Sequence, residues 1–379
     1  RRARHKTGTT RTPTRSPTMH TPAPATATAG STAPPTNTDT GTVLLVGGTG
    51  FIGRAVLKAL TRHHRVHGTT PSLRVLSRRT PPTLAAHHVT GDLTDPPSLH
   101  GICSGITTVI HTASYVGSDP QKCHAINHTG TQALLAEAAR HAVTRFIYVS
   151  TASVYGTGPH RGPHEGQLQP APLSPASTTR LHAEEAVRAA GGTILRPHLI
   201  YGTGDHWFIP TLARILRHIP TWPDTPPPHT SAIAVQDLAR IITALTHQPP
   251  PHSDDAGATY HVADPRPLPM DHLHTRLRTL LHLPPAHPTP ITEHRAQVRK
   301  HLPQLTDHQY ALLTEDHYYD TTRIWHHTQL HPGPGFHTRF TTNTPWYTHH
   351  LNHPTLNHLT LNHPTPTTPP QTILPPAPA

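Results

Sequence analysis

A glycine-rich turn between an apolar run and a helical pattern limits the fold of this chain more than any other feature. Residues 42–53 read Thr-Val-Leu-Leu-Val-Gly-Gly-Thr-Gly-Phe-Ile-Gly, and the pattern Arg-Ala-Val-Leu-Lys-Ala-Leu follows at once. Gly48, Gly50 and Gly53 fit G-x-G-x-x-G, and Gly47 with the last two fits the looser G-x-x-G-x-x-G. Glycine permits the tight turn, the approach of a pyrophosphate and close packing of the helix. Because a helix N-terminus also attracts phosphate, the segment predicts a dinucleotide site rather than a purely structural turn.

Strands and helices alternate from residue 42 to about residue 200. Strands are expected at 43–46, 73–76, 87–90, 107–111, 145–149 and 193–195, with the clearest helices at 130–141 and 179–190. This alternation is typical of an α/β fold with a doubly wound parallel sheet, the Rossmann fold, and helices on both faces. Beyond residue 201 the pattern predicts a smaller C-terminal α/β substrate cap, with helices at 207–218, 235–246 and 271–282 and a strand at 259–262.

These patterns divide the 379 residues into four segments. Residues 1–41 are rich in Thr, Pro and Ala without a hydrophobic period, and we expect a disordered extension. Residues 42–204 form the predicted dinucleotide-binding domain. Residues 205–351 form the predicted cap, some of whose elements are expected to return to the first domain. Residues 352–379 carry short Leu-Asn-His repeats and end in prolines, which predicts a low-complexity tail without a core of its own.

The composition argues against several classes of protein. The chain has 46 Pro, 39 His and a formal net charge of +11, but its Lys and Arg are scattered except in the Arg-rich first fifteen residues. No nucleic-acid partner is therefore expected, and the basic start is the one feature that favours it. The histidines are not spaced with carboxylates as metal ligands are, so no metal site is expected.

Cysteine usage and hydropathy bear on the compartment. Cys103 and Cys123 are too few for a disulfide framework, which favours a reducing compartment, and both are expected to be buried. The sequence contains no run of 18 apolar residues, so no membrane span is expected. The Arg-rich start lacks the apolar region of a secretory signal. We therefore expect a cytoplasmic protein without a membrane partner.

Charged residues after the second and third predicted strands bear on the choice of coenzyme. Arg78 and Arg79 follow the second strand, where an acidic residue would bind a ribose 2′-hydroxyl and an arginine can pair with a 2′-phosphate. Arg78 therefore predicts NADP, with NAD as the other coenzyme, and a solvated basic turn is the alternative. Asp92 is placed to accept a hydrogen bond from the adenine amino group, and the alternative is a helix cap.

The ordered set of motifs resembles the extended short-chain dehydrogenases/reductases of the NAD-dependent epimerase/dehydratase family. The resemblance runs from about residue 42 to residue 351 and rests on the glycine turn, Gly91-Asp-Leu, His111-Thr-Ala, Asn127-His-Thr-Gly-Thr, Val149-Ser-Thr-Ala-Ser-Val-Tyr-Gly and Leu195-Arg-Pro-His-Leu-Ile-Tyr-Gly. It implies an NAD(P)-dependent enzyme with a small-molecule substrate, and it admits a homodimer. It also implies the residues that line the coenzyme: Gly47, Gly50, Phe51, Ile52, Gly53, Arg78, Asp92, Leu93, His111, Thr112 and Ala113, with Pro197, His198 and Leu199 beside the nicotinamide.

The catalytic pattern of the family is incomplete in this sequence. Family members use a Ser or Thr together with the Tyr and Lys of Y-x-x-x-K. Thr151 fits the hydroxyl position, but Ala176 stands at the tyrosine position and Arg180 at the lysine position. No frame shift repairs this departure, because no Tyr or Lys lies between Tyr155 and Tyr201.

Three interpretations of this departure stay open. Arg180 keeps a positive charge that is suited to holding the ribose, although a guanidinium does not relay protons. A substitute acid can come from Tyr115, His182, His198 or the substrate itself. The third interpretation is that coenzyme is bound without turnover. Tyr155 and Tyr201 are expected to pack and hydrogen-bond structurally.

The sequence therefore predicts an NAD(P)-dependent oxidoreductase or epimerase-like enzyme that transfers hydride to or from a secondary alcohol or ketone. The expected substrate is a nucleotide sugar or a specialised metabolite. Thr151 is expected to polarise the substrate oxygen, and Arg180 to hold the ribose. The alternative is a catalytically impaired sensor or scaffold that binds NADP.

Overall fold

The computed structural model describes residues 42–69, 72–79, 87–249 and 256–352. The predicted N-terminal extension, residues 1–41, lies outside the described residues, and so does the predicted tail beyond residue 352. The described residues belong to one compact unit of the chain. The predicted division at residue 204 stays a prediction.

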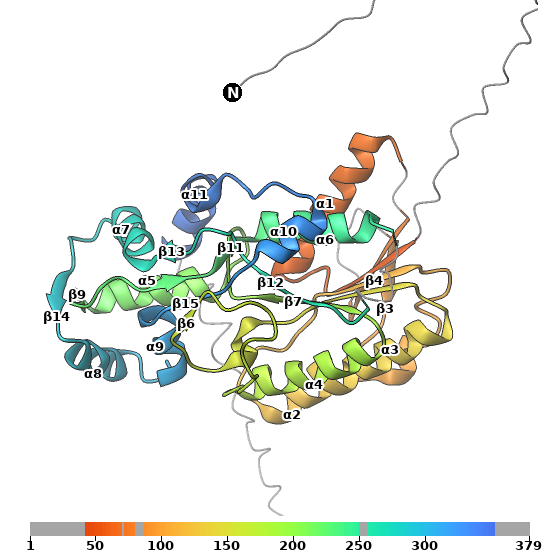
Figure 1. Ribbon diagram of the computed structural model, residues 1–379, viewed down its shortest axis with the longest axis horizontal. Helices are drawn as coiled ribbons and strands as arrows, with labels where there is room; N and C mark the ends of the chain where they lie inside the picture. The colour runs from red at the N-terminus through yellow and green to blue at the C-terminus, as the bar shows by residue number, and fades with distance from the viewer. Residues whose placement is uncertain (1–41, 70–71, 80–86, 250–255, 353–379) are drawn as a thin grey trace, which may run out of the picture. The chain divides into compact units, whose positions relative to one another are not determined.

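The centre of this unit is a seven-stranded parallel sheet (Figure 1). Its spatial order is β12-β7-β5-β4-β1-β2-β3, so the chain winds outward in both directions from the pair β1 and β4. This order confirms the doubly wound fold, which holds ligands at the carboxyl edge of the strands where the order reverses. The strands are β1 (Val43–Val46), β2 (Leu73–Ser77), β3 (His87–Thr90), β4 (Thr108–His111), β5 (Arg145–Val149), β7 (Thr193–Pro197) and β12 (Thr259–Val262).

Helices cover both faces of the sheet, as Figure 1 shows. Alternate side chains of β1 point to opposite faces of the sheet. Val43 and Leu45 pack with one set of helices, and Leu44 and Val46 pack with the other. The first set is α1 (Phe51–His67), α6 (Val235–His247) and α10 (Thr322–Thr328). The second set is α3 (Gly130–Arg140) and α4 (Pro175–Ala189), with the short α2 (Pro120–Cys123) beside α4.

The start of α4 differs from the predicted start at residue 179. The helix begins at Pro175 because Ser174 caps it: the Ser174 hydroxyl accepts a hydrogen bond from the Ser177 N–H, and the Ser177 side chain bonds back to the Ser174 N–H. Proline is favoured at the first helical position. This extra turn brings Ala176 into the helix.

A second cluster of helices forms its own apolar core, at the left of Figure 1. Leu212, Leu216, Leu273 and Tyr347 are among its fully buried members. The helices that contribute are α5 (Phe208–His218), α7 (Met270–Leu280), α8 (Ile291–His301), α9 (Asp307–Thr314) and α11 (Gly335–Asn352). The predicted cap helices at 207–218 and 271–282 are thus present with ends shifted by one or two residues, whereas α8, α9 and α11 were not predicted.

Short strands join this helical cluster to the main sheet. A four-stranded sheet has the order β13-β10-β15-β6, and it consists of β13 (Leu268–Pro269), β10 (His229–Thr230), β15 (His317–Tyr318) and β6 (His160–Arg161). Two pairs complete the set: β11 (Ala232–Ala234) with β8 (Leu199–Tyr201), and β14 (His287–Thr289) with β9 (Thr221–Pro223).

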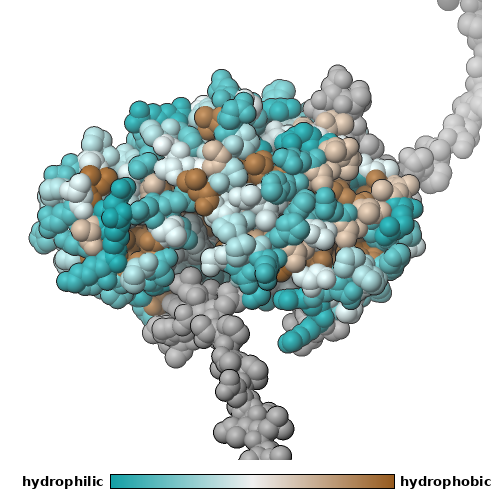
Figure 2. Space-filling view, turned by 90° about the horizontal axis from the view of Figure 1, so that it is seen from below, coloured by the Kyte–Doolittle hydropathy of each residue, from teal (hydrophilic) through white to brown (hydrophobic). Residues whose placement is uncertain are grey.

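The surface of the described residues is mixed in polarity. On the face in Figure 2, hydrophobic side chains lie scattered among hydrophilic ones. Large apolar side chains that are well exposed include Val66, Val116 and Leu173. Among the helices of the described part, none combines the length and apolar character that a membrane crossing requires.

Candidate coenzyme and catalytic site

The glycine turn connects β1 to α1 at the carboxyl edge of the sheet. Gly47 has φ +87°, and a Cβ there would lie 2.7 Å from the Ala113 nitrogen and 2.9 Å from the Thr112 hydroxyl. A Cβ on Gly53 would lie 2.7 Å from the Gly47 carbonyl carbon. The Gly50 N–H donates to the Gly47 carbonyl at 2.9 Å. Only glycine therefore fits at positions 47 and 53, as the motif requires.

The N-terminus of α1 has the features of an anion site. Gly50 is its N-cap and offers no side chain to cap the first N–H groups, and the first turn contains no acidic residue. Unpaired N–H groups and the positive end of the helix dipole favour a phosphate at such a position. The residues of the turn thus fit the diphosphate of a dinucleotide.

The end of β4 packs against this turn. Thr112 donates to the Val46 carbonyl from both its N–H and its hydroxyl, each at 2.9 Å. The imidazole of His111, which was predicted to line the coenzyme, is instead fully buried, and its Nε2 lies 3.0 Å from the Thr131 hydroxyl of α3. Burial, with the nearby Arg180 charge, lowers the pKa of His111 to about 3. Thr112 and Ala113 therefore contact the glycine turn, whereas the His111 side chain is packed in the core.

The predicted adenosine residues follow β2 and β3. Arg78 is exposed directly after β2. Asp92 accepts hydrogen bonds from the N–H and the hydroxyl of Thr94, both at 2.9 Å, so one carboxylate oxygen already stabilises a turn. Leu93 is buried against Gly130, where a Cβ would come within 2.7 Å of it. Phe51 and Ile52 are partly buried in the first turn of α1.

Thr151 and the guanidinium of Arg180 both lie at the end of β5. The Thr151 hydroxyl accepts from the Ser153 N–H at 3.1 Å and caps the short turn Ala152–Tyr155. One terminal nitrogen of Arg180 donates to the carbonyls of Val149 at 3.0 Å and Ser150 at 2.6 Å. The Arg180 Nε is buried with no acceptor among the described residues. Part of the guanidinium is thus occupied by the backbone of the sheet edge.

Tyr155 belongs to a buried polar network, in line with its predicted structural role. Arg196 forms an ion pair with Glu184, both side chains being almost fully buried. One terminal nitrogen of Arg196 bonds to Glu184, and the other donates to the Tyr155 hydroxyl at 2.7 Å. That hydroxyl also lies 2.6 Å from the Nε2 of His261. Burial raises the pKa of Tyr155. The tyrosine is therefore held as a protonated structural group.

We expect Arg196→Met to destabilise the protein by about 3–5 kcal/mol, because it leaves the buried Glu184 carboxylate without its partner. Urea unfolding measures this loss. The double variant Arg196→Met/Glu184→Met is expected to recover most of it, because it removes both charges. A double variant as unstable as Arg196→Met would contradict this account.

The residues at the end of β7, which were predicted to lie beside the nicotinamide, are largely enclosed by the protein. Pro197 and Leu199 are buried. The His198 ring stacks on His317 with 5.7 Å between ring centroids, and neither of its nitrogens has a partner among the described residues. Burial, reinforced by His317 and His160, lowers the pKa of His198 well below its ordinary value. His198 is therefore a neutral group at neutral pH.

Asn127 is a positioning residue for which no role was predicted, although it begins the motif Asn-His-Thr-Gly-Thr. Its side-chain oxygen accepts from the Tyr115 N–H at 2.7 Å and from the Ser114 hydroxyl at 3.2 Å. Its amide nitrogen donates to the Tyr115 carbonyl at 2.9 Å and to the Thr179 hydroxyl at 3.2 Å. Asn127 thereby ties the loop after β4 to α4.

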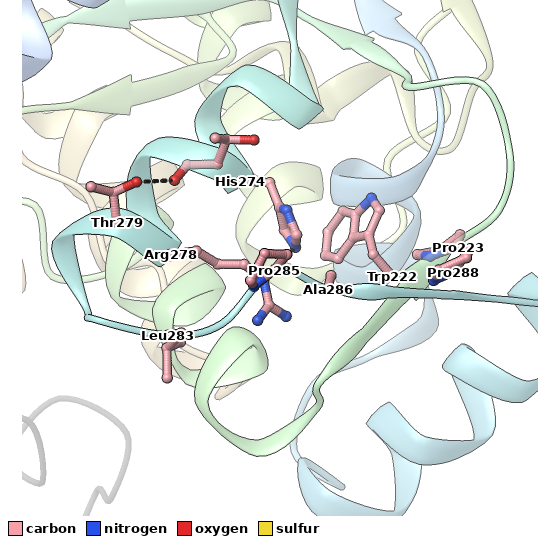
Figure 3. A pocket seen from close by; sticks show the side chains of 10 residues that line it. Trp222, Pro223, His274, Arg278, Thr279, Leu283, Pro285, Ala286 and Pro288 are labelled. Atoms are coloured by element: carbon pink, nitrogen blue, oxygen red, sulfur yellow. Dashed lines mark hydrogen bonds between the residues drawn. The ribbon is translucent and has the colours of Figure 1, made fainter.

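A cavity of about 420 Å³ lies away from this sheet edge, in the second helical cluster (Figure 3). Trp222 and His274 form one wall, with 4.4 Å between their ring centroids. Arg278 lines it too, but its guanidinium donates to the carbonyls of Pro284 and Ile219. No residue of the predicted coenzyme site lines this cavity.

Comparison with known proteins agrees with this geometry. The model of the NAD dependent epimerase/dehydratase family matches residues 43–261, more than half of the chain. The chain belongs to this family. The matched segment begins at β1, contains the glycine turn and ends in β12.

Two curated relatives are reductases by name. The 2-alkyl-3-oxoalkanoate reductase of Stenotrophomonas maltophilia is 30% identical over 195 residues, which is 46% of this chain and 56% of that protein. The ceramide reductase of Caulobacter vibrioides is 36% identical over 173 residues, 44% of this chain and 48% of that protein. The chain thus matches about half the length of each relative.

Solved structures share the fold. DesIV, a dTDP-glucose 4,6-dehydratase from Streptomyces venezuelae crystallised with NAD and TYD, has a TM-score of 0.63 and 20% sequence identity. The alignment covers 82% of this chain and 98% of that one. This likeness extends to the second helical cluster, because the matched share is larger than the segment from residue 43 to residue 261.

Proposed function

We propose that the protein binds NADP, with NAD as the other coenzyme, and transfers hydride to or from a secondary alcohol or ketone. The observation that carries this proposal is the glycine turn. Gly47 and Gly53 leave no room for a Cβ, and the α1 N-terminus directly after them has no side-chain cap. Such a turn at the point where the strand order reverses is suited to a dinucleotide.

The residues that would hold the coenzyme lie along the carboxyl edge of the sheet. Main-chain N–H groups of the turn would bind the diphosphate, and the exposed Arg78 would pair with a 2′-phosphate. The bound coenzyme would supply or accept hydride at its nicotinamide. The other residues assigned to it are Phe51, Ile52, Asp92, Leu93, the main chain at His111, Thr112 and Ala113, and Pro197, His198 and Leu199 at the nicotinamide end.

Thr151 and Arg180 are the proposed catalytic pair at the end of β5. Among the described residues, the Thr151 hydroxyl accepts from the Ser153 N–H and donates to no acceptor, so its own proton is available to a substrate oxygen. Arg180 has donors beyond the one bonded to Val149 and Ser150, and these suit the nicotinamide ribose. A donor aimed at the oxygen where charge develops lowers the barrier.

For the substrate, the proposal covers two chemical classes. The relatives named as reductases suggest a ketone with an apolar substituent, whereas DesIV is named for a nucleotide sugar. We propose a small molecule of one of these two classes. Cys103 and Cys123 are buried and unpaired, which supports a reducing, cytoplasmic location. A homodimer is part of the same proposal by family membership.

Hydride transfer is tested by following NADPH absorbance with two sets of probes, 3-oxo esters and nucleotide sugars. We expect oxidation of NADPH with a 3-oxo ester, or conversion of a nucleotide sugar with bound NAD. A chain that binds coenzyme but converts no probe in either set would contradict the proposed reaction.

For coenzyme preference, we expect Arg78→Asp to weaken NADPH binding relative to NADH by about 10- to 100-fold, the range for losing a charged hydrogen bond and adding a like charge. Calorimetric titration with both coenzymes measures the ratio. Arg79→Asp is the matched control, because it changes the neighbouring exposed arginine. Equal ratios in all three proteins would remove the argument for NADP.

The second candidate function is an NADP-binding sensor or scaffold without efficient turnover. Two observations favour it: Ala176 has no acidic group, and one terminal nitrogen of Arg180 is already bonded to two backbone carbonyls. This candidate predicts coenzyme binding with full affinity, no conversion of any probe, and a protein partner whose affinity depends on the redox state of the coenzyme.

A further inference from the structure

We propose that Tyr115 gives the proton to the substrate oxygen in the hydride transfer, an inference that rests on the proposed function. A carbonyl that accepts hydride at carbon needs a proton at oxygen, and a positioned hydroxyl or imidazole normally supplies it. Ala176, in the first turn of α4, has no proton to donate, so the acid must be another residue.

Burial excludes most of the tyrosines. The chain has nine tyrosines, all within the described residues. Tyr318 is partly exposed, but it pairs with Arg161 in the small sheet of β6 and β15. Tyr115 is also partly exposed, and it follows β4 at the carboxyl edge of the main sheet. The other seven are buried: Tyr148, Tyr155, Tyr201, Tyr260, Tyr310, Tyr319 and Tyr347.

The main chain before Tyr115 is locked to the glycine turn. A Cβ on Gly47 would collide with Ala113 and the Thr112 hydroxyl, so the two backbones are in van der Waals contact. Thr112 is fixed in turn by its two hydrogen bonds to Val46. Tyr115 comes two residues after Ala113, and it therefore leaves the sheet beside the proposed diphosphate site.

The other side of the loop is tied to the catalytic helix. Asn127 bonds both the N–H and the carbonyl of Tyr115, and its amide also donates to the Thr179 hydroxyl. Thr179 precedes Arg180 and lies one turn after Ala176. These bonds hold Tyr115 between the glycine turn, where the diphosphate is proposed to bind, and α4, which carries Arg180 of the proposed catalytic pair.

Packing against Gly117 fixes the position of the Tyr115 ring. A Cβ on Gly117 would collide with the Tyr115 hydroxyl and would lie 2.5 Å from the Tyr115 Cζ, so the hydroxyl end of the ring packs directly on the Gly117 backbone. The Gly117 carbonyl accepts from the Cys123 thiol at 3.3 Å, and Asp119 caps α2. Gly117 is thus a positioning residue, because any side chain there would displace the phenol ring.

The histidines are poorer candidates. His182 is exposed on α4, with its ring 5.5 Å from that of His128. His198 is enclosed against His317, and its lowered pKa keeps it neutral, so it has no imidazolium proton to donate at neutral pH. Tyr115 combines a transferable proton with a position at the sheet edge.

In the proposed step, the carbonyl carbon accepts hydride, and the electron pair of the C=O π bond moves to oxygen. That oxygen takes the proton of the Tyr115 hydroxyl, and water returns a proton to the phenolate. The net reaction consumes one NADPH and one proton and forms the alcohol. The reverse sequence oxidises an alcohol.

The location of Tyr115 is tested without a substrate, by nitration with tetranitromethane and peptide mass spectrometry. We expect nitration of Tyr115 and Tyr318 in the free chain. NADPH at ten times its dissociation constant should slow nitration of Tyr115 by about tenfold and leave Tyr318 unchanged. Binding of NADPH by calorimetry without protection of Tyr115 would overturn the inference and leave coenzyme binding intact. Absence of binding would be a failure of the proposed function itself.

The role of the hydroxyl is tested with variants that keep the ring or move it. Tyr115→Phe should bind NADPH as the wild-type chain does and lose about 10²- to 10⁴-fold in turnover of a 3-oxo ester. Gly117→Ala should keep the hydroxyl but lose both turnover and protection from nitration. Tyr318→Phe is the matched control with normal turnover. Full activity of Tyr115→Phe would show that another group donates the proton.

Discussion

Replacement of Gly53 by alanine is expected to reduce NADPH affinity by about 100-fold and stability by about 1–3 kcal/mol. The added methyl group would point at backbone, because it would lie 2.7 Å from the Gly47 carbonyl carbon and from the Gly48 Cα. Backbone cannot rotate away as a side chain can. The start of α1 must therefore shift from the turn, and the N–H groups that face the diphosphate shift with it.

Gly68→Ala is the matched control for this prediction. Gly68 caps the other end of α1 with φ +66°, and a Cβ there meets nothing within 4 Å. The substitution should cost about 1 kcal/mol through the backbone conformation alone. Calorimetric titration with NADPH and urea unfolding separate the two effects. If Gly53→Ala binds NADPH as Gly68→Ala does, the turn does not hold the diphosphate.

Acid is expected to unfold the protein between about pH 6 and pH 4.5. Five buried histidines have lowered pKa values because burial penalises their charged forms: about 3 for His111, and about 4 for His160, His261, His274 and His294. The ordinary value of 6.5 applies to the unfolded chain. Below pH 6.5 the unfolded state therefore binds more protons than the folded state, so stability falls as the pH falls.

The size of this effect is comparable to the whole stability of a domain. A pKa lowered from 6.5 to about 4 corresponds to on the order of 3 kcal/mol for each histidine, and native domains are stable by about 5–15 kcal/mol. Protonation of all 39 histidines also raises an already positive net charge of +11. The free energy of unfolding, measured in urea at a series of pH values, should fall steeply below pH 6.5.

Two phenylalanine variants make the pH prediction specific. His294 is fully buried, with its Nδ1 2.7 Å from the Tyr310 hydroxyl, whereas His337 is exposed on α11. His294→Phe should bind about one proton fewer than the wild-type chain on unfolding between pH 6.5 and pH 4, and His337→Phe is the matched control at an exposed position. A stability that does not change between pH 7 and pH 5 would contradict the role given to the buried histidines.

The sequence predicted those parts of the fold that local pattern determines. The bounds of β1, β3, β5 and β12 are as predicted, because each is a short run ended by turn residues. The helices α8 and α11 escaped prediction for physical reasons. α8 is rich in charged residues, and α11 contains Pro345, which normally ends a helix. Their stability comes from packing in the second apolar core, which a local pattern does not reveal.

The candidate site was predictable in its backbone and less so in its side chains. The glycine turn and residues 112–113 meet as expected, because both lie at the carboxyl ends of adjacent parallel strands. The direction of His111 depends on α3 covering that face, and the bond from Asn127 to Thr179 joins segments far apart in the sequence. Such contacts follow from tertiary packing rather than from spacing.

Calorimetric titration of the full chain with NADPH tests whether the turn at residues 47–53 binds a dinucleotide. We expect saturable binding at one site per chain, with a gain in thermal stability that grows with NADPH concentration. Absence of heat and of stabilisation with NADPH, NADP, NADH and NAD alike would contradict the account.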